Sequence, residues 1–253
     1  MSKKILTCEE VTKVFERDGR TFKALDAVSF DLYEGDILGI IGESGSGKST
    51  ISNLIMGLFE VTEGRIFFDG KEISHASRAE RRSMYQQVQM VFQNAVGSFN
   101  PRRTIGATLE DTLCFLCSCR SGGNEKRIAE LLELVGLPAH YADKYPFELS
   151  GGECQRAAIA RAMAVCPKVI ICDEATSALD VSAQAKIVTL LKHLQEVHDM
   201  TFIFITHDLP LVSSLATRLI IMDQGKIVEE GETIRVITNP QTEVTKRLVN
   251  AVL

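Results

Sequence analysis

The sequence predicts an α/β protein with a buried parallel sheet, an N-terminal antiparallel β region and an inserted lobe of α-helices. Three observations favour this class. Short, fully apolar runs are typical of parallel strands that are covered on both faces. The first 35 residues alternate apolar and polar side chains, as half-buried antiparallel strands do. Residues 93–168 lie between two apolar runs that are predicted to be parallel strands. A crossover between parallel strands needs only about a dozen residues, so this longer segment predicts a separate lobe.

Residues 1–35 are expected to form the antiparallel β region. One of its strands is indicated by apolar side chains at every second position: Val28, Phe30 and Leu32. A further hairpin is expected at residues 64–73, because an Asp69-Gly70 turn lies between two strand-like segments. We group this hairpin with the core of the domain.

The core is expected to comprise residues 36–93 and 165–225. Its parallel strands are the short apolar runs Ile37–Ile41, Val88–Phe92, Val169–Cys172, Phe202–Thr206 and Leu219–Met222. An amphipathic helix between two of these strands has one apolar face, made by Ile187, Leu190, Leu191, Leu194 and Val197. Residues 94–164 form the helical subdomain, and residues 226–253 supply a C-terminal hairpin and short helices. The whole chain, 1–253, is predicted to be one domain.

The composition excludes several classes of function. Acidic residues outnumber basic residues by 33 to 28, and the formal charge of −5 argues against general binding of nucleic acid. No apolar run reaches the ~18 residues that span a bilayer. The N-terminus has no apolar segment of signal-peptide length. We therefore expect a cytoplasmic chain whose membrane contact comes through a partner.

Three cysteines, Cys114, Cys117 and Cys119, are spaced as C-x-x-C-x-C and raise the possibility of a metal site. No nearby fourth cysteine or histidine completes a tetrahedral set. The leucines Leu109, Leu113 and Leu116 recur at helical spacing through the same segment. We interpret the cysteines as buried small apolar residues of a helix.

A phosphate-binding loop is indicated by the pattern G-x-x-x-x-G-K-[ST] between an apolar strand and a helix. Its residues are Gly42, Glu43, Ser44, Gly45, Ser46, Gly47, Lys48, Ser49 and Thr50. Such loops direct backbone N–H groups at a polyphosphate, and the helix that follows adds its positive end. Lys48 would contact the β- and γ-phosphates of a nucleotide triphosphate, and Ser49 would bind Mg²⁺. A chance glycine-rich turn is the alternative, expected in about one such chain in a hundred.

Two carboxylates follow an apolar strand, at Asp173 and Glu174. Ligands of open parallel sheets bind beyond the carboxyl ends of the strands, so these side chains should lie beside the phosphate loop. Asp173 suits Mg²⁺, and Glu174 suits polarisation of the attacking water. A strand end that enters a solvated turn would have the same pattern, but the phosphate loop favours the functional interpretation.

The segment Leu149–Arg156 opens a helix of the inserted lobe. Ser150 and Glu153 fit a capping box, which could be purely structural. Gly151 and Gly152 lie between them, and two residues without side chains at a helix N-terminus leave backbone N–H groups open to an anion.

Taken together, these motifs resemble those of the nucleotide-binding subunit of an ATP-binding cassette (ABC) transporter, over about residues 5–253. The resemblance implies a P-loop NTPase with a RecA-like core, and Ser150–Glu153 as a signature that binds the opposing subunit's ATP. It implies that Gln93 lies near Mg²⁺ and the attacking water. Asp180 would lie in the D-loop that crosses to the opposing subunit, and His207 would contact the γ-phosphate. The adenine-stacking aromatic would be Phe15, with Phe22 as the alternative. Glu153 replaces a frequent Gln, and we expect little effect on turnover.

The resemblance also implies cofactors, partners and location. These are ATP and Mg²⁺, a second ABC ATPase in a hetero- or homodimer, two transmembrane permease subunits, and an extracytoplasmic solute-binding protein. The chain would lie on the cytoplasmic face of the cell membrane as a peripheral protein. No nucleic-acid partner is expected.

The segment Gln93–Arg102 resembles peptide and nickel importers of the family, as do residues 161–164 and the end of the chain. The usual His-Pro-Tyr after Asn239-Pro240 is replaced by other residues, and the C-terminal extension of many peptide importers is missing. Peptides, nickel and metal–chelator complexes therefore stay open as solutes. The alternatives in function are an ABC exporter ATPase and a soluble ABC protein of DNA repair or translation, although the chain has one cassette and no heptad array.

Overall fold

The computed structural model describes residues 3–17, 19–117 and 122–251. Within these residues a six-stranded sheet forms the centre, in the order β10-β9-β3-β8-β7-β6. The strands are β3 (Ile37–Gly42), β6 (Val88–Phe92), β7 (Val169–Asp173), β8 (Thr201–Thr206), β9 (Arg218–Asp223) and β10 (Lys226–Glu232). All neighbours pair in parallel except β9 and β10. The five predicted core strands and the hairpin at the end of the sheet are confirmed.

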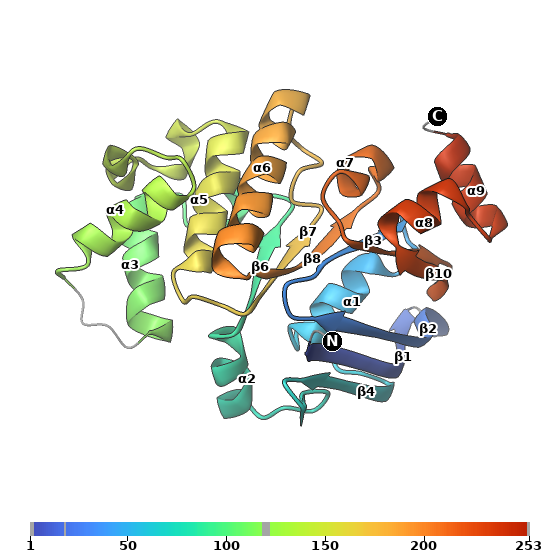
Figure 1. Ribbon diagram of the computed structural model, residues 1–253. Coiled ribbons are helices and arrows are strands. Elements are labelled where there is room, and N and C mark those ends of the chain that lie inside the picture. Colours follow the sequence, from blue (N-terminus) through green and yellow to red (C-terminus); the bar gives the residue numbers. More distant parts are fainter. Residues whose placement is uncertain (1–2, 18, 118–121, 252–253) are drawn as a thin grey trace.

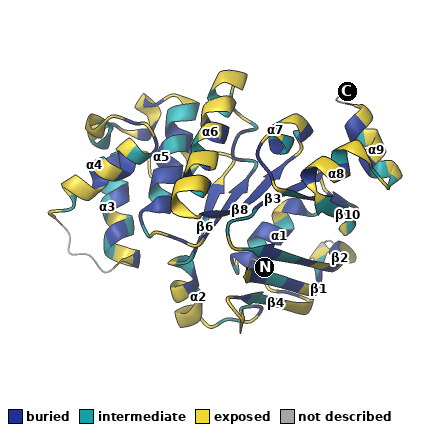
Figure 2. Ribbon diagram, viewed as in Figure 1, coloured by how far each residue is buried: buried dark blue, intermediate teal, exposed yellow. Residues whose placement is uncertain are grey.

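The strands of the central sheet are mostly buried (Figure 2). Their successive side chains enter two different cores, one on each face of the sheet. In β8, Phe202 and Phe204 pack on one side, and Ile203 and Ile205 pack on the other. A strand that is covered on both faces favours apolar side chains at successive positions, which is why these segments are mostly apolar runs.

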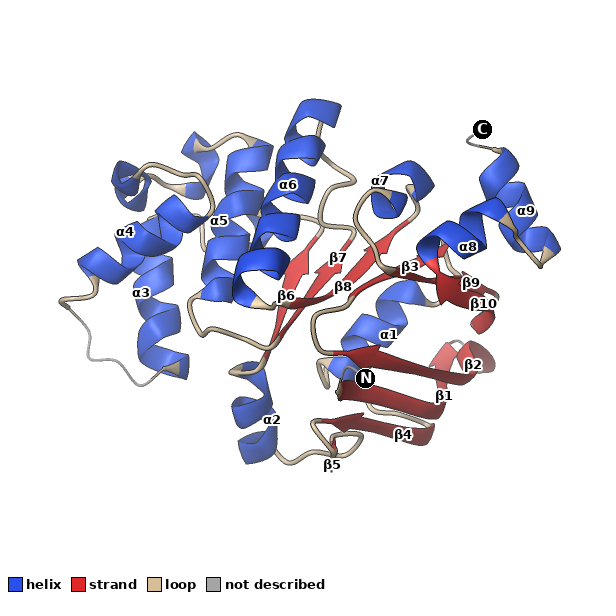
Figure 3. Ribbon diagram, viewed as in Figure 1, coloured by secondary structure: helices blue, strands red, loops and turns tan. Residues whose placement is uncertain are grey.

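A second sheet is antiparallel, in the order β2-β1-β4-β5 (Figure 3). Its strands are β1 (Lys4–Arg17), β2 (Arg20–Tyr33), β4 (Glu63–Phe68) and β5 (Lys71–Glu72). The hairpin predicted at residues 64–73 is present, but its assignment to the core was wrong. Leu6 of β1 pairs with Phe68 of β4, so the hairpin extends the antiparallel sheet. Sequence periodicity cannot reveal this, because it does not identify the partner of a strand.

Helices fill the remaining layers (Figure 1). Helix α1 (Lys48–Ile55) lies between the two sheets, whereas α5 (Gly151–Met163), α6 (Val181–His198) and α7 (Leu209–Ser213) cover the other face of the central sheet. The inserted segment contains α3 (Ile105–Leu116), α4 (Glu125–Leu134) and the short 3-10 helices η1 (Val96–Ser98), η2 (Ala139–Asp143) and η3 (Pro146–Glu148). The boundaries of the subdomains stay a prediction.

Helix α2 (Arg78–Tyr85) was not predicted, although the sequence carried a signal for it. Ser77 and Glu80 form a complete capping box at its start. Within α6, the prediction that Val197 shares the apolar face was wrong, because its side chain is 59% exposed near the end of the helix. The C-terminal helices α8 (Thr233–Thr238) and α9 (Glu243–Asn250) follow β10, as expected. No helix within the described ranges is long and apolar enough to cross a membrane.

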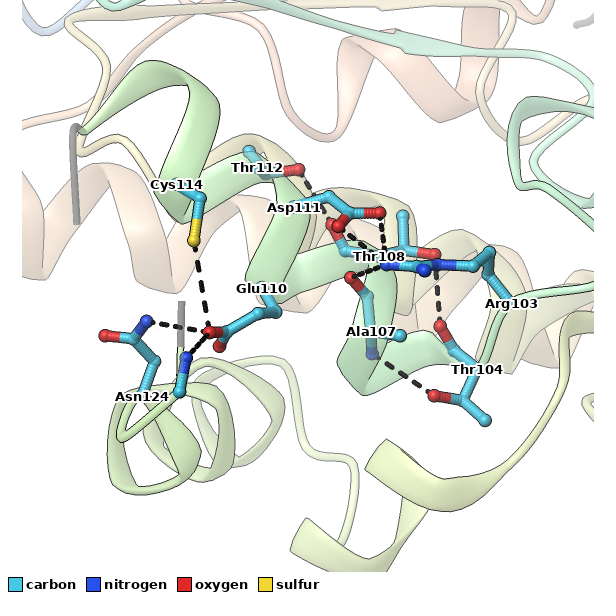
Figure 4. A network of polar contacts seen from close by, with 10 residues as sticks. Arg103, Thr104, Ala107, Thr108, Glu110, Asp111, Thr112, Cys114 and Asn124 are labelled. Atoms are coloured by element: carbon cyan, nitrogen blue, oxygen red, sulfur yellow. Dashed lines mark hydrogen bonds and ion pairs between the residues drawn. The ribbon is translucent and has the colours of Figure 1, made fainter. Parts of the chain in front are cut away.

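Polar contacts join α3 to the start of α4 (Figure 4). One carboxylate oxygen of Glu110 accepts hydrogen bonds from the Asn124 side chain at 3.1 Å and from Cys114 at 3.9 Å. The cysteines are not the buried apolar residues we expected, because Cys114 is half-buried and Cys117 is exposed. Cys119 lies outside the described residues.

Candidate nucleotide site

The phosphate loop joins β3 to α1 and opens the N-terminus of α1. The N-cap residue Gly47 has a φ of 103°, and a Cβ there would lie 2.6 Å from the carbonyl oxygen of Ala24. Both facts require glycine. No side chain caps the helix at this end, so its first N–H groups remain available to an anion.

Lys48 is buried under the loop and folds back on it. Its Nζ donates to the carbonyl oxygens of Gly42 and Glu43, both at 2.8 Å. Burial lowers the pKa of Lys48, while the charges of Glu174 and Asp173 act in the opposite direction. A polyphosphate that enters the loop offers this ammonium group a partner of full negative charge in place of two carbonyls.

Asp173 lies at the carboxyl end of β7 and contacts α1 through two hydroxyl groups. Ser49 donates to Oδ1 and Ser52 donates to Oδ2, each at 3.0 Å. Burial raises the pKa of Asp173, the two serine hydroxyls lower it, and Glu174 raises it further. The predicted pair Ser49 and Asp173 is therefore brought together. Ser52 was missed, although its place three residues after Ser49 puts it on the same face of the helix.

Glu174 follows directly, in the left-handed region with a φ of 49°. Its backbone N–H donates to the carbonyl oxygen of Ile205 in β8 at 2.9 Å, which holds this conformation. Its Oε1 lies 3.6 Å from Nδ1 of His207, whose side chain is 61% exposed. Two predicted residues from neighbouring strands thus meet at one edge of the sheet, where a side chain can orient water.

Gln93 follows β6 but is not joined to Ser49 or Asp173 by any hydrogen bond that the structure describes. Its Nε2 donates instead to Ser177 Oγ at 2.9 Å. Asp180 accepts from the backbone N–H of Ala183 at 2.8 Å and so caps α6. The side chain of Asp180 therefore has a structural role, whatever it does in an assembly.

The signature residues open α5 with a capping box. Ser150 accepts from the backbone N–H of Glu153 and donates its own N–H and hydroxyl to Glu153 Oε2, both at 2.8 Å. The glycines also have a packing role within the chain, because a Cβ on Gly152 would lie 3.0 Å from Ala183 of α6 and one on Gly151 would lie 3.3 Å from Leu179. A cavity of about 260 Å³ lies beside them and is lined by the signature and the D-loop.

The predicted adenine contact lies on the antiparallel sheet. Phe15 is half-buried, with its ring edge-to-face with Phe59 at 5.2 Å and 4.9 Å from Nζ of Lys13. The alternative, Phe22, is opposite Phe15 in the pairing of β1 with β2 and is 58% exposed. Stacking on adenine stays a prediction for both.

The residues of this edge fit a magnesium ion. Mg²⁺ prefers a few hard oxygen ligands together with nucleotide phosphates. Ser49 Oγ and the Asp173 carboxylate supply such oxygens 3.0 Å apart, next to the loop that would carry the phosphates. When bound there, the ion would neutralise charge on the β- and γ-phosphates.

Residues 25–177 match the family described as ABC transporter. The oligopeptide transport ATP-binding protein OppF of Bacillus subtilis is 40% identical, over 100% of this chain and 83% of that protein. The glutathione import ATP-binding protein GsiA of Pectobacterium atrosepticum is 42% identical over 94% of this chain, which spans 38% of that protein. A dimeric ATP-binding cassette in a post-hydrolysis state, bound to ADP and Pi, is 33% identical with a TM-score of 0.83, over 90% of this chain and 99% of that one.

The fold and the site define a P-loop NTPase with an antiparallel sheet and a helical insert. The chain belongs to the ABC transporter family, as its motifs predicted, and it is an ATP-binding, ATP-hydrolysing subunit.

Proposed function

We propose that this chain is the energy-coupling ATPase of an importer for peptides. Its relatives are named for oligopeptide transport and for glutathione import, and glutathione is itself a short peptide. These names favour peptides over nickel or a metal–chelator complex, and import over export. The observation that most supports ATP hydrolysis at this site is the hydrogen bond from Ser49 of the phosphate loop to Asp173 of β7.

In this proposal the loop and α1 hold the phosphates of ATP, with Lys48 on the β- and γ-phosphates. Ser49 and Asp173 hold the magnesium ion. Glu174 accepts a proton from the attacking water, and His207 contacts the γ-phosphate from the neighbouring strand. Gln93 would lie near the magnesium ion and the attacking water after leaving Ser177, to which it donates at 2.9 Å.

The assembly is proposed to contain two ATPase subunits, each of which completes the other's site. Ser150, Gly151 and Gly152 would bind the γ-phosphate held by the opposing phosphate loop, and Asp180 would lie at the crossing. The similarity to a dimeric cassette supports this arrangement. Peptide importers of this family usually pair two different ATPases, so we favour a heterodimer.

Coupling to the membrane is proposed to use a groove of about 730 Å³ between the core and the helical insert. Its wall is mostly apolar, and its residues come from the segment after α1, from α2, β6 and the loop after it, and from η1, α3 and α5: Met56, Leu58, Tyr85, Gln89, Met90, Phe92, Asn94, Gly97, Ser98, Phe115, Leu116 and Arg161. A helical segment of a permease subunit fits such a groove, because an amphipathic helix buries its apolar face there. The chain would then lie against the cytoplasmic face of the membrane, with an extracytoplasmic solute-binding protein on the other side.

Glu174→Gln tests the chemistry. The amide keeps the shape of the side chain but cannot accept a proton, so hydrolysis should fall on the order of a hundredfold or more while ATP still binds. ATP should then trap a closed dimer, visible as a larger species on size exclusion when the partner subunit carries the same change. Glu196→Gln, on an exposed part of α6, is the control. Hydrolysis at the normal rate in the double variant would refute the role of Glu174.

Uptake tests the solute. Cells with and without the chain should differ in uptake of a radiolabelled dipeptide and should not differ in uptake of nickel. Cells that carry Glu174→Gln should match cells without the chain. A difference confined to nickel would overturn the peptide assignment and leave the ATPase assignment intact.

A further inference from the structure

Glu153 places a negative charge in the first turn of α5, at the helix N-terminus where the proposed function requires a phosphate to bind. Its Oε2 accepts from the Ser150 N–H and hydroxyl, and its Oε1 accepts from the hydroxyl of Tyr141 at 2.6 Å. Both oxygens are therefore engaged. These contacts, from Tyr141 first and then Ser150, lower the pKa of Glu153 to about 2, so the carboxylate is charged at neutral pH.

Tyr141 comes from η2, which is fixed against the start of α3. A Cβ on Gly106 of α3 would lie only 2.8 Å from the carbonyl oxygen of Ala142, so the absence of a side chain permits this contact. The backbone N–H of Ile105 donates to the carbonyl oxygen of Lys144 at 2.8 Å. Lys144 also places its Nζ 3.6 Å from the centre of the Tyr141 ring. The hydroxyl of Tyr141 is thus presented to α5 from a rigid support.

We propose that Tyr141 is a positioning residue for the signature, because it holds the Glu153 carboxylate so that Ser150 can bind the opposing subunit's ATP. This inference rests on the proposed function of Ser150. It assigns a role to a residue outside the phosphate loop, the acidic strand end and the signature.

The physical reason is competition for one proton. The Ser150 hydroxyl has a single hydrogen, which it now donates to Glu153 Oε2 at 2.8 Å. To donate to a phosphate it must leave that oxygen. The Tyr141 hydrogen bond draws charge toward Oε1 and so weakens the hold of Oε2 on the Ser150 proton.

The experiment is a double-mutant cycle with Tyr141→Phe and Glu153→Gln in the purified transporter complex. Glu174→Gln is present in every sample, so that ATP drives closure without hydrolysis. The readout is the ATP concentration for half-maximal closure. We expect Tyr141→Phe to raise it about tenfold or more, because a lost hydrogen bond to a charged group costs at least about a factor of ten. With Glu153→Gln present, the same change should have an effect below about twofold, because no charge remains to be held.

Two further readouts separate positioning from a general loss of structure. The affinity of the isolated chain for ATP should be unchanged in Tyr141→Phe, because the signature serves the other subunit's nucleotide. The control is Tyr145→Phe, which removes a hydroxyl from a neighbouring residue whose ring stacks on Phe147. It should leave half-maximal closure unchanged.

Three results would overturn the inference. They are an unchanged half-maximal concentration in Tyr141→Phe, an equal effect with and without Glu153→Gln, and a matching loss of ATP affinity in the isolated chain. Failure of the proposed function is recognised separately. If complexes with intact Tyr141 and Glu174→Gln do not close with ATP, the arrangement of two subunits is wrong and the role of Tyr141 fails with it.

Discussion

The two helix N-termini predicted to bind phosphate, those of α1 and α5, differ in how they are capped. Helix α1 begins at a glycine with no side-chain cap, and the nearby ammonium group of Lys48 bonds loop carbonyls. Helix α5 begins at Ser150 with a complete capping box. The first end is open to a ligand, whereas the second must exchange an internal hydrogen bond for one to the ligand. In the proposed function, this difference predicts that nucleotide binds first to the phosphate loop and only later to the signature.

Helix α2 gives this comparison an internal reference. It has the same box at Ser77 and Glu80, and no predicted function lies there. A capping box is therefore ordinary helix chemistry in this chain. What distinguishes α5 is the glycine pair, the cavity shared with the D-loop, and the third hydrogen bond that Tyr141 donates to Glu153.

The largest expected effect is at the open end. Lys48→Ala should weaken binding of ATP to the isolated chain by on the order of a hundredfold, because it removes a buried cation from its anionic partner. Titration with a fluorescent ATP analogue measures the change. Lys246→Ala, which breaks an exposed ion pair with Glu243, is the control and should bind normally. If Lys48→Ala and the wild type bound ATP equally, the N-terminus of α1 would not be the primary nucleotide site, and its contrast with α5 would fail.

Ser150→Arg tests the self-capped end. It should leave ATP binding by the isolated chain within about twofold of wild type, while hydrolysis by the assembled complex falls at least about tenfold. A bulky cation there opposes the helix dipole and blocks the opposing phosphate. The matched control is Ser77→Arg, which makes the same change at the same position of the α2 box. Loss of hydrolysis in both variants would mean that capping alone explains the result.

The smallest expected effect is a pH dependence of stability. The folded pKa of Glu153, about 2, lies below the ordinary value of 4.5. The charged carboxylate therefore stabilises the fold above pH 4.5, and this contribution is lost as pH falls toward 2. In urea unfolding, the difference between wild type and Glu153→Gln should be constant from about pH 6 to pH 8 and shrink below about pH 5.

Glu80→Gln provides the comparison on α2. Hydrogen bonds from the Ser77 side chain and backbone also lower the pKa of Glu80. Among the residues that the structure describes, no tyrosine hydroxyl donates to Glu80 as Tyr141 does to Glu153. The loss on acidification should therefore be smaller for Glu80→Gln. If the difference in unfolding free energy between wild type and Glu153→Gln grew on acidification, the pKa of Glu153 would not be lowered in the folded state.

Much of this structure follows from local patterns. The core strands were predicted because they are buried on both faces. Asp173 was placed beside the phosphate loop and Ser49 because ligands of a parallel sheet bind beyond the carboxyl ends of its strands. These inferences need only periodicity and the geometry of a parallel sheet.

Other features depend on partners distant in the sequence. The hairpin at residues 64–73 was placed in the wrong sheet because the sequence of a strand does not identify the strand with which it pairs. Gln93 donates to Ser177 and not to the predicted magnesium ligands, an arrangement set by how two loops pack. Tyr141 was missed because it lies 12 residues before Glu153, with η3 between them. No spacing rule marks such a pair.

The position of β3 has a consequence for synthesis of the protein. Its neighbours in the sheet are β8 and β9: Ile37 pairs with Phe202, and Gly39 pairs with Leu219. At ~5–20 residues per second, the ribosome needs roughly 10 s or more between making β3 and making both partners. During that time the nascent chain carries a strand that is buried at every position in the fold, without the two strands that will pair with its edges. A chain that ends before β8 cannot close its sheet, so Ile37–Gly42 would remain an unpaired apolar strand, which is an aggregation hazard.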